Sequence, residues 1–236
     1  MSYGTLFLIP VPLGPGEPED SLPSPVLDQT RTLVHFVAEN AKSARAFLKA
    51  AQHPLPLQQI EISELNEHTR ENELTALLSP LLEGKNVGLI SEAGCPAVAD
   101  PGANLVALAH RRGIRVVPMV GPSSILLGVM ASGLSGQNFA FHGYLPAKEE
   151  ERRKRLKELE SESRKKRQTQ IFIETPYRNR QMLETVMATC AVETRLCTAT
   201  DLSQPGEQVI TQSIADWRKQ EKPDLDRRPT VFLLLA

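Results

Sequence analysis

The chain is poor in the residues that build disulfide frameworks and metal sites. Its 236 residues include three cysteines, Cys95, Cys190 and Cys197, and five histidines. An odd number of cysteines cannot pair fully and no C-x-x-C occurs, so we expect reduced thiols and a reducing compartment. No histidine stands at metal-ligand spacing from another histidine or from a cysteine, so we expect no zinc site.

The sequence also lacks an excess of charge, a long apolar run and a secretory signal. Its 27 Lys and Arg nearly balance 28 Asp and Glu, which excludes a uniformly basic nucleic-acid binder but allows one basic surface. The longest apolar stretch, 116–134, is interrupted by prolines, glycines and serines, so we expect no membrane span. Residues 1–4 carry no positive side chain of the kind that opens a signal peptide, and we expect a cytoplasmic protein.

The composition is that of a globular protein, and the first half alternates strand and helix patterns. Hydrophobic residues make up 41% of the chain and charged residues 23%. Short apolar, β-branched runs predict buried strands at 5–10, 33–38, 87–91 and 115–118, with helical segments at 44–50, 67–83 and 102–112 between them. Such alternation favours a mostly parallel sheet covered on both faces.

The pattern restarts after residue 120. We expect helices at 123–131 and 176–189, a highly charged segment at 148–167, and strands at 138–145, 169–173, 194–201, 207–214 and 230–235. The sequence therefore predicts an α/β fold of two α/β/α domains with mostly parallel or mixed sheets, spanning 1–119 and 120–236.

Residues 91–102, SEAGCPAVADPG, are the most informative stretch. They join a predicted strand to a predicted helix, the place where open α/β sheets bind ligands. Gly94 and Gly102 allow close backbone approach, Pro96 and Pro101 stiffen the loop, and Asp100 is suited to capping the helix. An ordinary strand-to-helix turn is an equally good interpretation. No dinucleotide or P-loop fingerprint occurs.

Four motifs in order resemble the tetrapyrrole methylase family, the class III S-adenosylmethionine-dependent methyltransferases. They are SEAGCPAVADPG at 91–102, VPMVGPSSILLGVMASGL at 117–134, FHGYLPAK at 141–148 and FIETPYRNRQMLE at 172–184. Within that family they look closest to the branch that methylates cytidine 2′-hydroxyls of small-subunit ribosomal RNA. The resemblance extends from residue 4 to about residue 184.

The resemblance implies two α/β domains with S-adenosylmethionine bound in the cleft between them, and it implies a homodimer by analogy. Matching the motifs residue by residue gives the expected cofactor contacts, which are mostly backbone groups and small hydroxyls: Pro10, Gly94, Cys95, Val98, Ser123, Ser124, Ile173, Glu174 and Thr230. Such groups bind adenine, ribose and carboxylate without placing a competing charge near the sulfonium. For Ser123 and Ser124 helix capping is an additional interpretation.

The acceptor side differs from the branch pattern. An AEDTR-like segment reads AENAK here, with Asn40 and Lys42 in place of Asp and Arg, and a TPIGN-like loop has lost its Asn. Because a ribose hydroxyl is a poor nucleophile, it needs a base, and Glu39 is the candidate, with Lys42 to hold a phosphate or an oxyanion. The alternative is that Glu39 is an acid of the kind favoured near a helix start and that Lys42 is an ordinary surface base.

The segment 148–167 allows two interpretations. Arg152, Arg153, Arg155 and the basic run 164–167 are candidates for contacts with phosphates. Opposite charges at i,i+3 and i,i+4 are instead typical of a solvated helix, which we favour.

Three functions compete at this point. The leading one is methyl transfer from S-adenosylmethionine to a ribose hydroxyl of ribosomal RNA. A second is a small-molecule acceptor such as a tetrapyrrole, although 5% aromatic residues offer few stacking partners. The third is a non-catalytic paralogue that binds cofactor or RNA.

Overall fold

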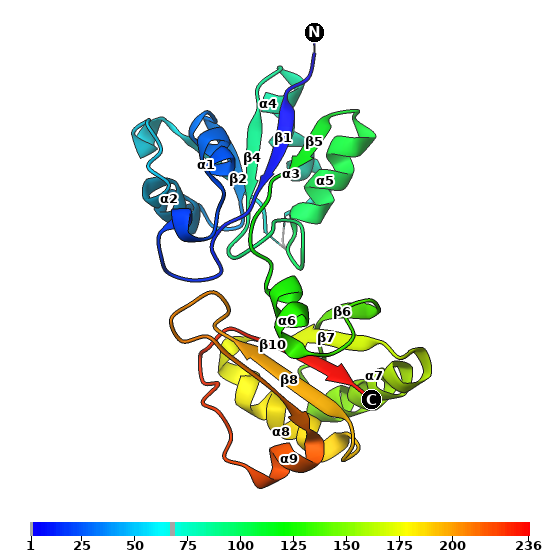
Figure 1. The fold of residues 1–236 in the computed structure, drawn as a ribbon. Coiled ribbons are helices and arrows are strands. Elements are labelled where there is room, and N and C mark those ends of the chain that lie inside the picture. Colours follow the sequence, from blue (N-terminus) through cyan, green and yellow to red (C-terminus); the bar gives the residue numbers. More distant parts are fainter. Residues whose placement is uncertain (1, 67–68) are drawn as a thin grey trace. The chain divides into compact units, whose positions relative to one another are not determined.

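The computed structural model describes residues 2–66 and 69–236. Contacts divide the chain into two compact units, Met1–Ser123 and Ser124–Ala236, each with its own five-stranded sheet (Figure 1). The α/β fold class predicted from the sequence is confirmed, with one parallel sheet and one mixed sheet.

The sheet of the first unit is parallel throughout, in the order β3-β2-β4-β1-β5. Its strands are β1 (Thr5–Ile9), β2 (His35–Ala38), β3 (Glu61–Glu64), β4 (Val87–Ile90) and β5 (Arg115–Pro118). The central strand β4 is buried along its whole length, as expected for a strand covered on both faces.

Helices cover both faces of this sheet. On one face α1 (Ser24–Arg31) and α2 (Ala41–Ala50) bury Leu27 and Leu48 against Phe36. On the other face α3 (Glu71–Leu77), α4 (Ser79–Leu82) and α5 (Gly102–Arg111) form a second cluster, in which Leu81 and Leu105 are fully buried. Figure 1 shows α1 and α2 on the opposite side of the sheet from α5.

Three sequence expectations for this unit were incomplete or wrong. The single helix expected at 67–83 is two short helices. Pro80 lacks the amide hydrogen needed to continue α3 and lies instead in the first turn of α4, which begins at Ser79. Residues 67 and 68 of that prediction lie outside the described residues. The patterns also missed α1 and β3, the latter a polar edge strand, EISE. The edge strand β5 is only partly buried.

The sheet of the second unit is mixed, in the order β6-β7-β10-β8-β9. It contains β6 (Phe139–Tyr144), β7 (Thr169–Ile173), β8 (Arg195–Thr200), β9 (Gln208–Ser213) and β10 (Thr230–Leu235). Only β6 and β7 are parallel, and the other pairs are antiparallel. The strand pair expected at 194–201 and 207–214 is therefore confirmed.

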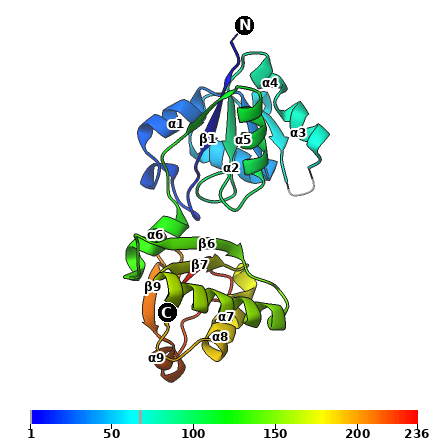
Figure 2. The same ribbon diagram turned by 90° about the vertical axis from the view of Figure 1, so that its right-hand side faces the viewer.

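Alternate residues of β10 face two different helical layers. Phe232 and Leu234 belong to the core under α7 (Glu149–Lys166), α8 (Asn179–Thr189) and α9 (Ile214–Lys219). Leu233 lies on the other face, where α6 (Ser124–Ser132) brings Gly128 against it. Figure 2 shows α7 and α8 on the opposite side of the sheet from α6. A 3₁₀ turn, Pro176–Arg178, precedes α8, so the proline at the start of that segment opens a 3₁₀ turn rather than the α-helix itself.

No helix in the described part of the chain is long and apolar enough to cross a membrane. Within the same residues, no three His, Cys, Asp or Glu side chains gather in a way that could hold a metal ion.

Trp217 tests the packing of the second unit. Its side chain is 1% exposed and its indole N–H donates to the carbonyl of Leu196 at 2.9 Å. Trp217→Ala should lower the free energy of unfolding by about 3–5 kcal/mol. Trp217→Phe keeps most of the contact but leaves that carbonyl without its donor, so it should cost about 1–3 kcal/mol. Urea denaturation measures both.

The matched control is Val192→Ala in the same unit. Val192 is 42% exposed, so its truncation should change the free energy of unfolding by less than about 0.5 kcal/mol. Equal losses at Trp217 and Val192 would contradict the assigned core.

Candidate functional site

The predicted site residues of the first unit follow the carboxyl ends of its parallel strands. Pro10 follows β1, Glu39 follows β2 and the loop 91–101 follows β4. Since these strands are parallel neighbours, paired Ala38 to Ile90 and Ile9 to Ile90, their carboxyl ends meet at one edge. This is the edge at which open α/β sheets bind ligands.

The loop after β4 is fastened to the segment after β1 by backbone pairing. The amide of Val11 donates to the carbonyl of Gly94 at 3.0 Å, and the amide of Gly94 donates back at 3.1 Å. The Ser91 hydroxyl also donates to the Gly94 carbonyl, at 3.0 Å. Gly94 has φ 69°, and a Cβ there would meet Leu13 Cδ2 at 3.0 Å. A side chain at this position would therefore be strained by the left-handed backbone and crowded by Leu13, so glycine is favoured.

The rest of the loop is held in an unusual conformation by one carboxylate. Ala97 and Ala99 have φ values of 65° and 58°, which cost about 1–3 kcal/mol each for residues with a Cβ. Asp100 Oδ1 accepts from the amide of Ala97 at 2.9 Å and from that of Gly102, the first residue of α5, at 2.7 Å. Burial raises the pKa of Asp100 above its usual value, although these two hydrogen bonds oppose the rise. Val98 at the loop tip is 47% exposed.

The segment after β5 approaches the same loop. A Cβ on Gly121 would lie 2.3 Å from Pro10 Cβ, so only glycine allows this contact. The Cys95 thiol donates to the carbonyl of Pro122 at 3.4 Å. Burial raises the pKa of Cys95, so its thiol stays protonated and neutral near neutral pH. Ser123 follows directly, and Ser124 is the first residue of α6.

Glu39 and Lys42 lie at the start of α2, where both are exposed. The Ser43 hydroxyl donates to Glu92 Oε2 at 3.1 Å, which links the start of α2 to the loop after β4. The two acceptor-side candidates thus belong to the same sheet edge as Gly94 and Cys95.

Asn40 is the N-cap of α2. Its Oδ1 accepts from the amides of Lys42 and Ser43 at 2.8 and 3.3 Å, while Glu64 accepts from the amide of Ala41 at 3.0 Å. Aspartate and asparagine cap helices about equally well. The change from Asp to Asn at residue 40 therefore keeps the capping role.

The candidates of the second unit form their own cluster. Val231 pairs with Ile173 in the antiparallel ladder, so Thr230 and Glu174 lie at the same end of the sheet. Glu174 is 5% exposed, and its Oε1 accepts from Arg178 Nη2 at 2.7 Å and from the Thr175 amide at 2.7 Å. Its Oε2 is buried without a hydrogen-bond partner among the described residues. The Thr230 hydroxyl donates to the carbonyl of Arg228 at 3.0 Å.

The structure thus brings Pro10, Gly94 and Cys95 together, and it separately groups Ile173, Glu174 and Thr230. Sequence reasoning did not identify the contacts that shape the first group, which come from Val11, Ser91 and Gly121. These depend on backbone pairing and close approach between distant segments, for which a single sequence carries no local signal.

The fold is that of an open α/β protein, a class in which ligands commonly bind at the strand ends. The family model for Tetrapyrrole (Corrin/Porphyrin) Methylases matches residues 8–217. The chain is 30% identical over 235 residues to ribosomal RNA small subunit methyltransferase I of Escherichia coli O157:H7, covering 100% of this chain and 78% of the relative. It is 34% identical over 223 residues to the protein of that name from Pseudomonas aeruginosa, covering 92% and 74%.

Solved structures agree on the fold. The methyltransferase CobJ superimposes with a TM-score of 0.64 at 18% identity, covering 100% of this chain and 95% of the other. A cobalt precorrin-4 methyltransferase superimposes with a TM-score of 0.61 at 15% identity, covering 98% and 94%. The chain belongs to the tetrapyrrole methylase family, whose members use S-adenosylmethionine as methyl donor.

Substitutions at residue 40 test the capping role. Asn40→Ala removes the acceptor for two amides of α2 and should lower the free energy of unfolding by about 1 kcal/mol. Asn40→Asp keeps the acceptor and should stay within about 0.5 kcal/mol of the parent. Thermal and urea denaturation compare the three proteins. Equal stability of the Ala variant and the parent would show that the Asn40 side chain does not stabilise α2 as an N-cap.

Proposed function

We propose that this protein is an S-adenosylmethionine-dependent methyltransferase that transfers a methyl group to a ribose 2′-hydroxyl of small-subunit ribosomal RNA. The observation that carries the proposal is the loop after β4, fixed by backbone pairing at the ligand-binding edge of the sheet. It is supported by 30–34% identity, over nearly the whole chain, to proteins named ribosomal RNA small subunit methyltransferase I.

The residues of the first unit suit the cofactor chemically. Pro10, Gly94, Val98 and Ser123 carry no charge, and the Cys95 thiol stays neutral because burial raises its pKa. No side chain of this set therefore competes with the positive sulfonium or repels it. Gly94 has no side chain that could restrict the approach of a ligand to this loop. When bound, the cofactor supplies the electrophilic methyl group.

The second unit contributes Ser124, Ile173, Glu174 and Thr230 in this proposal. The buried Glu174 Oε2 has no hydrogen-bond partner within the described residues. A buried acceptor of this kind costs free energy until a donor reaches it. An amino or hydroxyl group of the ligand would satisfy it.

Glu39 is proposed as the base that accepts the proton of the ribose hydroxyl, directly or through one water. Lys42, one turn further along, is proposed to hold a phosphate of the acceptor RNA or to stabilise the developing oxyanion. The exposure of both side chains is consistent with an acceptor that arrives from solvent. A homodimer and a cytoplasmic location belong to the same proposal, by analogy with the family.

Two alternatives have their own supporting observations. One of the solved structures named above is of a cobalamin biosynthetic enzyme. At 15–18% identity, however, these structures support the fold and say nothing about the acceptor of this chain. A non-catalytic paralogue was motivated by Asn40 and by the Asn lost from the TPIGN-like loop, and Asn40 has a structural role as the N-cap of α2. We therefore favour the RNA acceptor.

Cys95 provides a direct probe of cofactor binding. Alkylation of Cys95 by iodoacetamide should be slow at pH 7.5, because burial raises the Cys95 pKa. The alkylation rate should go on rising with pH above the pH at which the rate for an ordinary thiol levels off. Saturating S-adenosylhomocysteine should slow it further, by at least about fivefold if the ligand covers the sulfur. Peptide mass spectrometry of the modified protein gives the rate for each cysteine.

The other two thiols are internal controls. Burial raises the pKa of Cys190 to about 12 and that of Cys197 to about 11, so both should resist alkylation until the protein unfolds, with or without ligand. An unchanged Cys95 rate under ligand saturation would remove this residue from the site. No calorimetric heat and no thermal shift at millimolar ligand would overturn cofactor binding altogether.

Methyl transfer tests the acceptor and the base together. Labelled cofactor is incubated with small ribosomal subunits from cells that lack this protein, and the site of label is mapped to base or ribose. Glu39→Gln keeps the size of the side chain but removes its charge. It should therefore leave cofactor affinity unchanged and lower turnover by a factor of about 10²–10⁴.

The matched control for this variant is Glu221→Gln, an exposed residue of the second unit, which should transfer methyl at the parental rate. A loss of less than about threefold in Glu39→Gln would show that Glu39 is not the base. Transfer to a tetrapyrrole but not to ribosomal subunits would overturn the RNA acceptor.

A further inference from the structure

The helix α7 carries three different faces along its 18 residues. The face toward the core contains Arg152, Leu156, Leu159 and Ser163, at spacings of four, three and four residues. Arg152 is 1% exposed and donates to the Ala147 carbonyl and to the Thr185 hydroxyl. Arg152 is therefore neither a phosphate contact nor part of a solvated face, because its guanidinium is buried inside the unit.

A second face is neutralised by ion pairs within the helix. Arg155 lies 3.1 Å from Glu158 and 3.8 Å from Glu162, which also pairs with Lys166 at 3.2 Å. Arg153, at the border of this face, pairs with Glu149 at 2.7 Å. These cations would have to break existing contacts to bind a phosphate.

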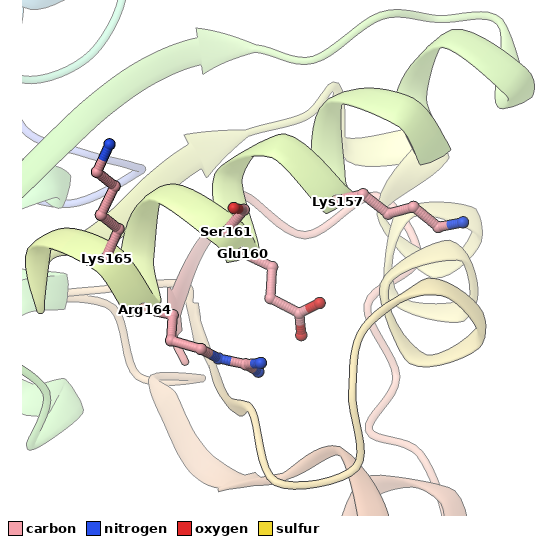
Figure 3. Close-up of a pocket in the computed structure, with 5 residues that line it drawn as sticks. All are labelled: Lys157, Glu160, Ser161, Arg164 and Lys165. Carbon is pink, nitrogen blue, oxygen red and sulfur yellow. The ribbon is translucent and has the colours of Figure 1, made fainter.

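The third face keeps its positive charge. Lys157, Arg164 and Lys165 are exposed, and no ion pair with a carboxylate is found for them among the described residues. With Glu160 and Ser161 they line a pocket of about 340 Å³ (Figure 3). We call Lys157, Arg164 and Lys165 the basic face. Figure 3 shows Glu160 and Arg164 pointing to the same side of α7, while Lys157 and Lys165 extend toward opposite ends of the helix.

The one acid in this pocket is already engaged. Glu160 Oε1 accepts from the amide of Ala191 at 2.7 Å and from the hydroxyl of Thr194. It lies within ion-pair distance of none of the basic-face cations. The pocket therefore has a local excess of two positive charges over one helix face, although the whole chain has a net charge of −1.

We propose that the basic face binds the phosphate backbone of the acceptor RNA and positions it. This inference rests on the proposed function for the identity of the partner. Lys157 and Arg164 are seven residues apart, about 10.5 Å along the helix axis, so they can reach different phosphates. Backbone contacts of this type fix orientation and register without reading sequence.

The chemistry of the pocket favours RNA over other anionic partners. Its lining contains no apolar side chain, whereas small-molecule pockets are lined mainly by apolar groups. Helices that bind anionic membranes pair a basic face with an apolar one exposed to the lipid, but the apolar residues of α7 are buried in the core. Binding of a phosphate backbone requires neither an apolar pocket lining nor an exposed apolar face.

Two triple variants of equal charge change test the inference. Lys157→Gln/Arg164→Gln/Lys165→Gln removes the basic face, and Arg153→Gln/Arg155→Gln/Lys166→Gln removes three cations that are paired. Binding to deproteinised small-subunit ribosomal RNA is measured by fluorescence anisotropy between 50 and 200 mM salt. The basic-face variant should bind at least about tenfold more weakly at 100 mM. Its slope of log affinity against log salt should be shallower by about 2–3, since each lost phosphate contact contributes 0.7–0.9.

The paired-face variant should change affinity by less than about threefold, and thermal denaturation verifies that both variants are folded. Equal losses in the two variants would mean that net charge alone matters, and would overturn the inference. Binding to vesicles containing anionic lipid in preference to RNA would also overturn it.

Methyl transfer separates this inference from the proposed function. If the parent protein methylates ribosomal subunits and the basic-face variant shows the same KM and kcat, this inference is overturned and the proposed function is not. A parent that binds RNA through the basic face but transfers no methyl group overturns the proposed function alone. No RNA binding by the parent overturns both.

Discussion

The two hydrogen bonds between Val11 and Gly94 hold the candidate site of the first unit in shape. They connect the segment after β1 to the loop after β4, and they form because neighbouring parallel strands bring their carboxyl ends to one edge. Around this pair, Ser91 donates to the Gly94 carbonyl, and Asp100 holds the left-handed backbone of Ala97. The loop is thereby preorganised before any ligand arrives, which reduces the entropy that binding must overcome.

Much of the fold was predictable because many of its strands are short apolar runs with clear boundaries. The strands Arg115–Pro118, Thr169–Ile173 and Thr230–Leu235 were predicted to the residue. The misses have physical causes. The edge strand β3, Glu61–Glu64, is polar because one side of it has no neighbour to cover it, and Pro80 divides a continuous helical pattern into two helices.

The candidate site was predictable only through motif resemblance, since its residues are too ordinary to identify by type. Gly94 and Cys95 became candidates by motif, and the structure adds that residue 94 has a left-handed backbone, which favours glycine. For helix α7 the sequence predicted the element correctly but not the environment of its side chains. Its sequence indicates a solvated, charged helix, but which of its cations remain available depends on three faces that only the folded unit defines.

The central claim is that the backbone-built edge of the first unit binds the cofactor. Gly121→Ala tests it most directly, because the added methyl would lie 2.3 Å from Pro10 Cβ and must displace one of the segments that shape the edge. Gly136→Ala is the control, since its added Cβ meets Val129 at 3.5 Å, an ordinary contact. Calorimetric titration with S-adenosylhomocysteine should give parental affinity for Gly136→Ala and at least about tenfold weaker binding for Gly121→Ala, with both proteins folded by circular dichroism. Undiminished affinity in a folded Gly121→Ala protein would contradict the account.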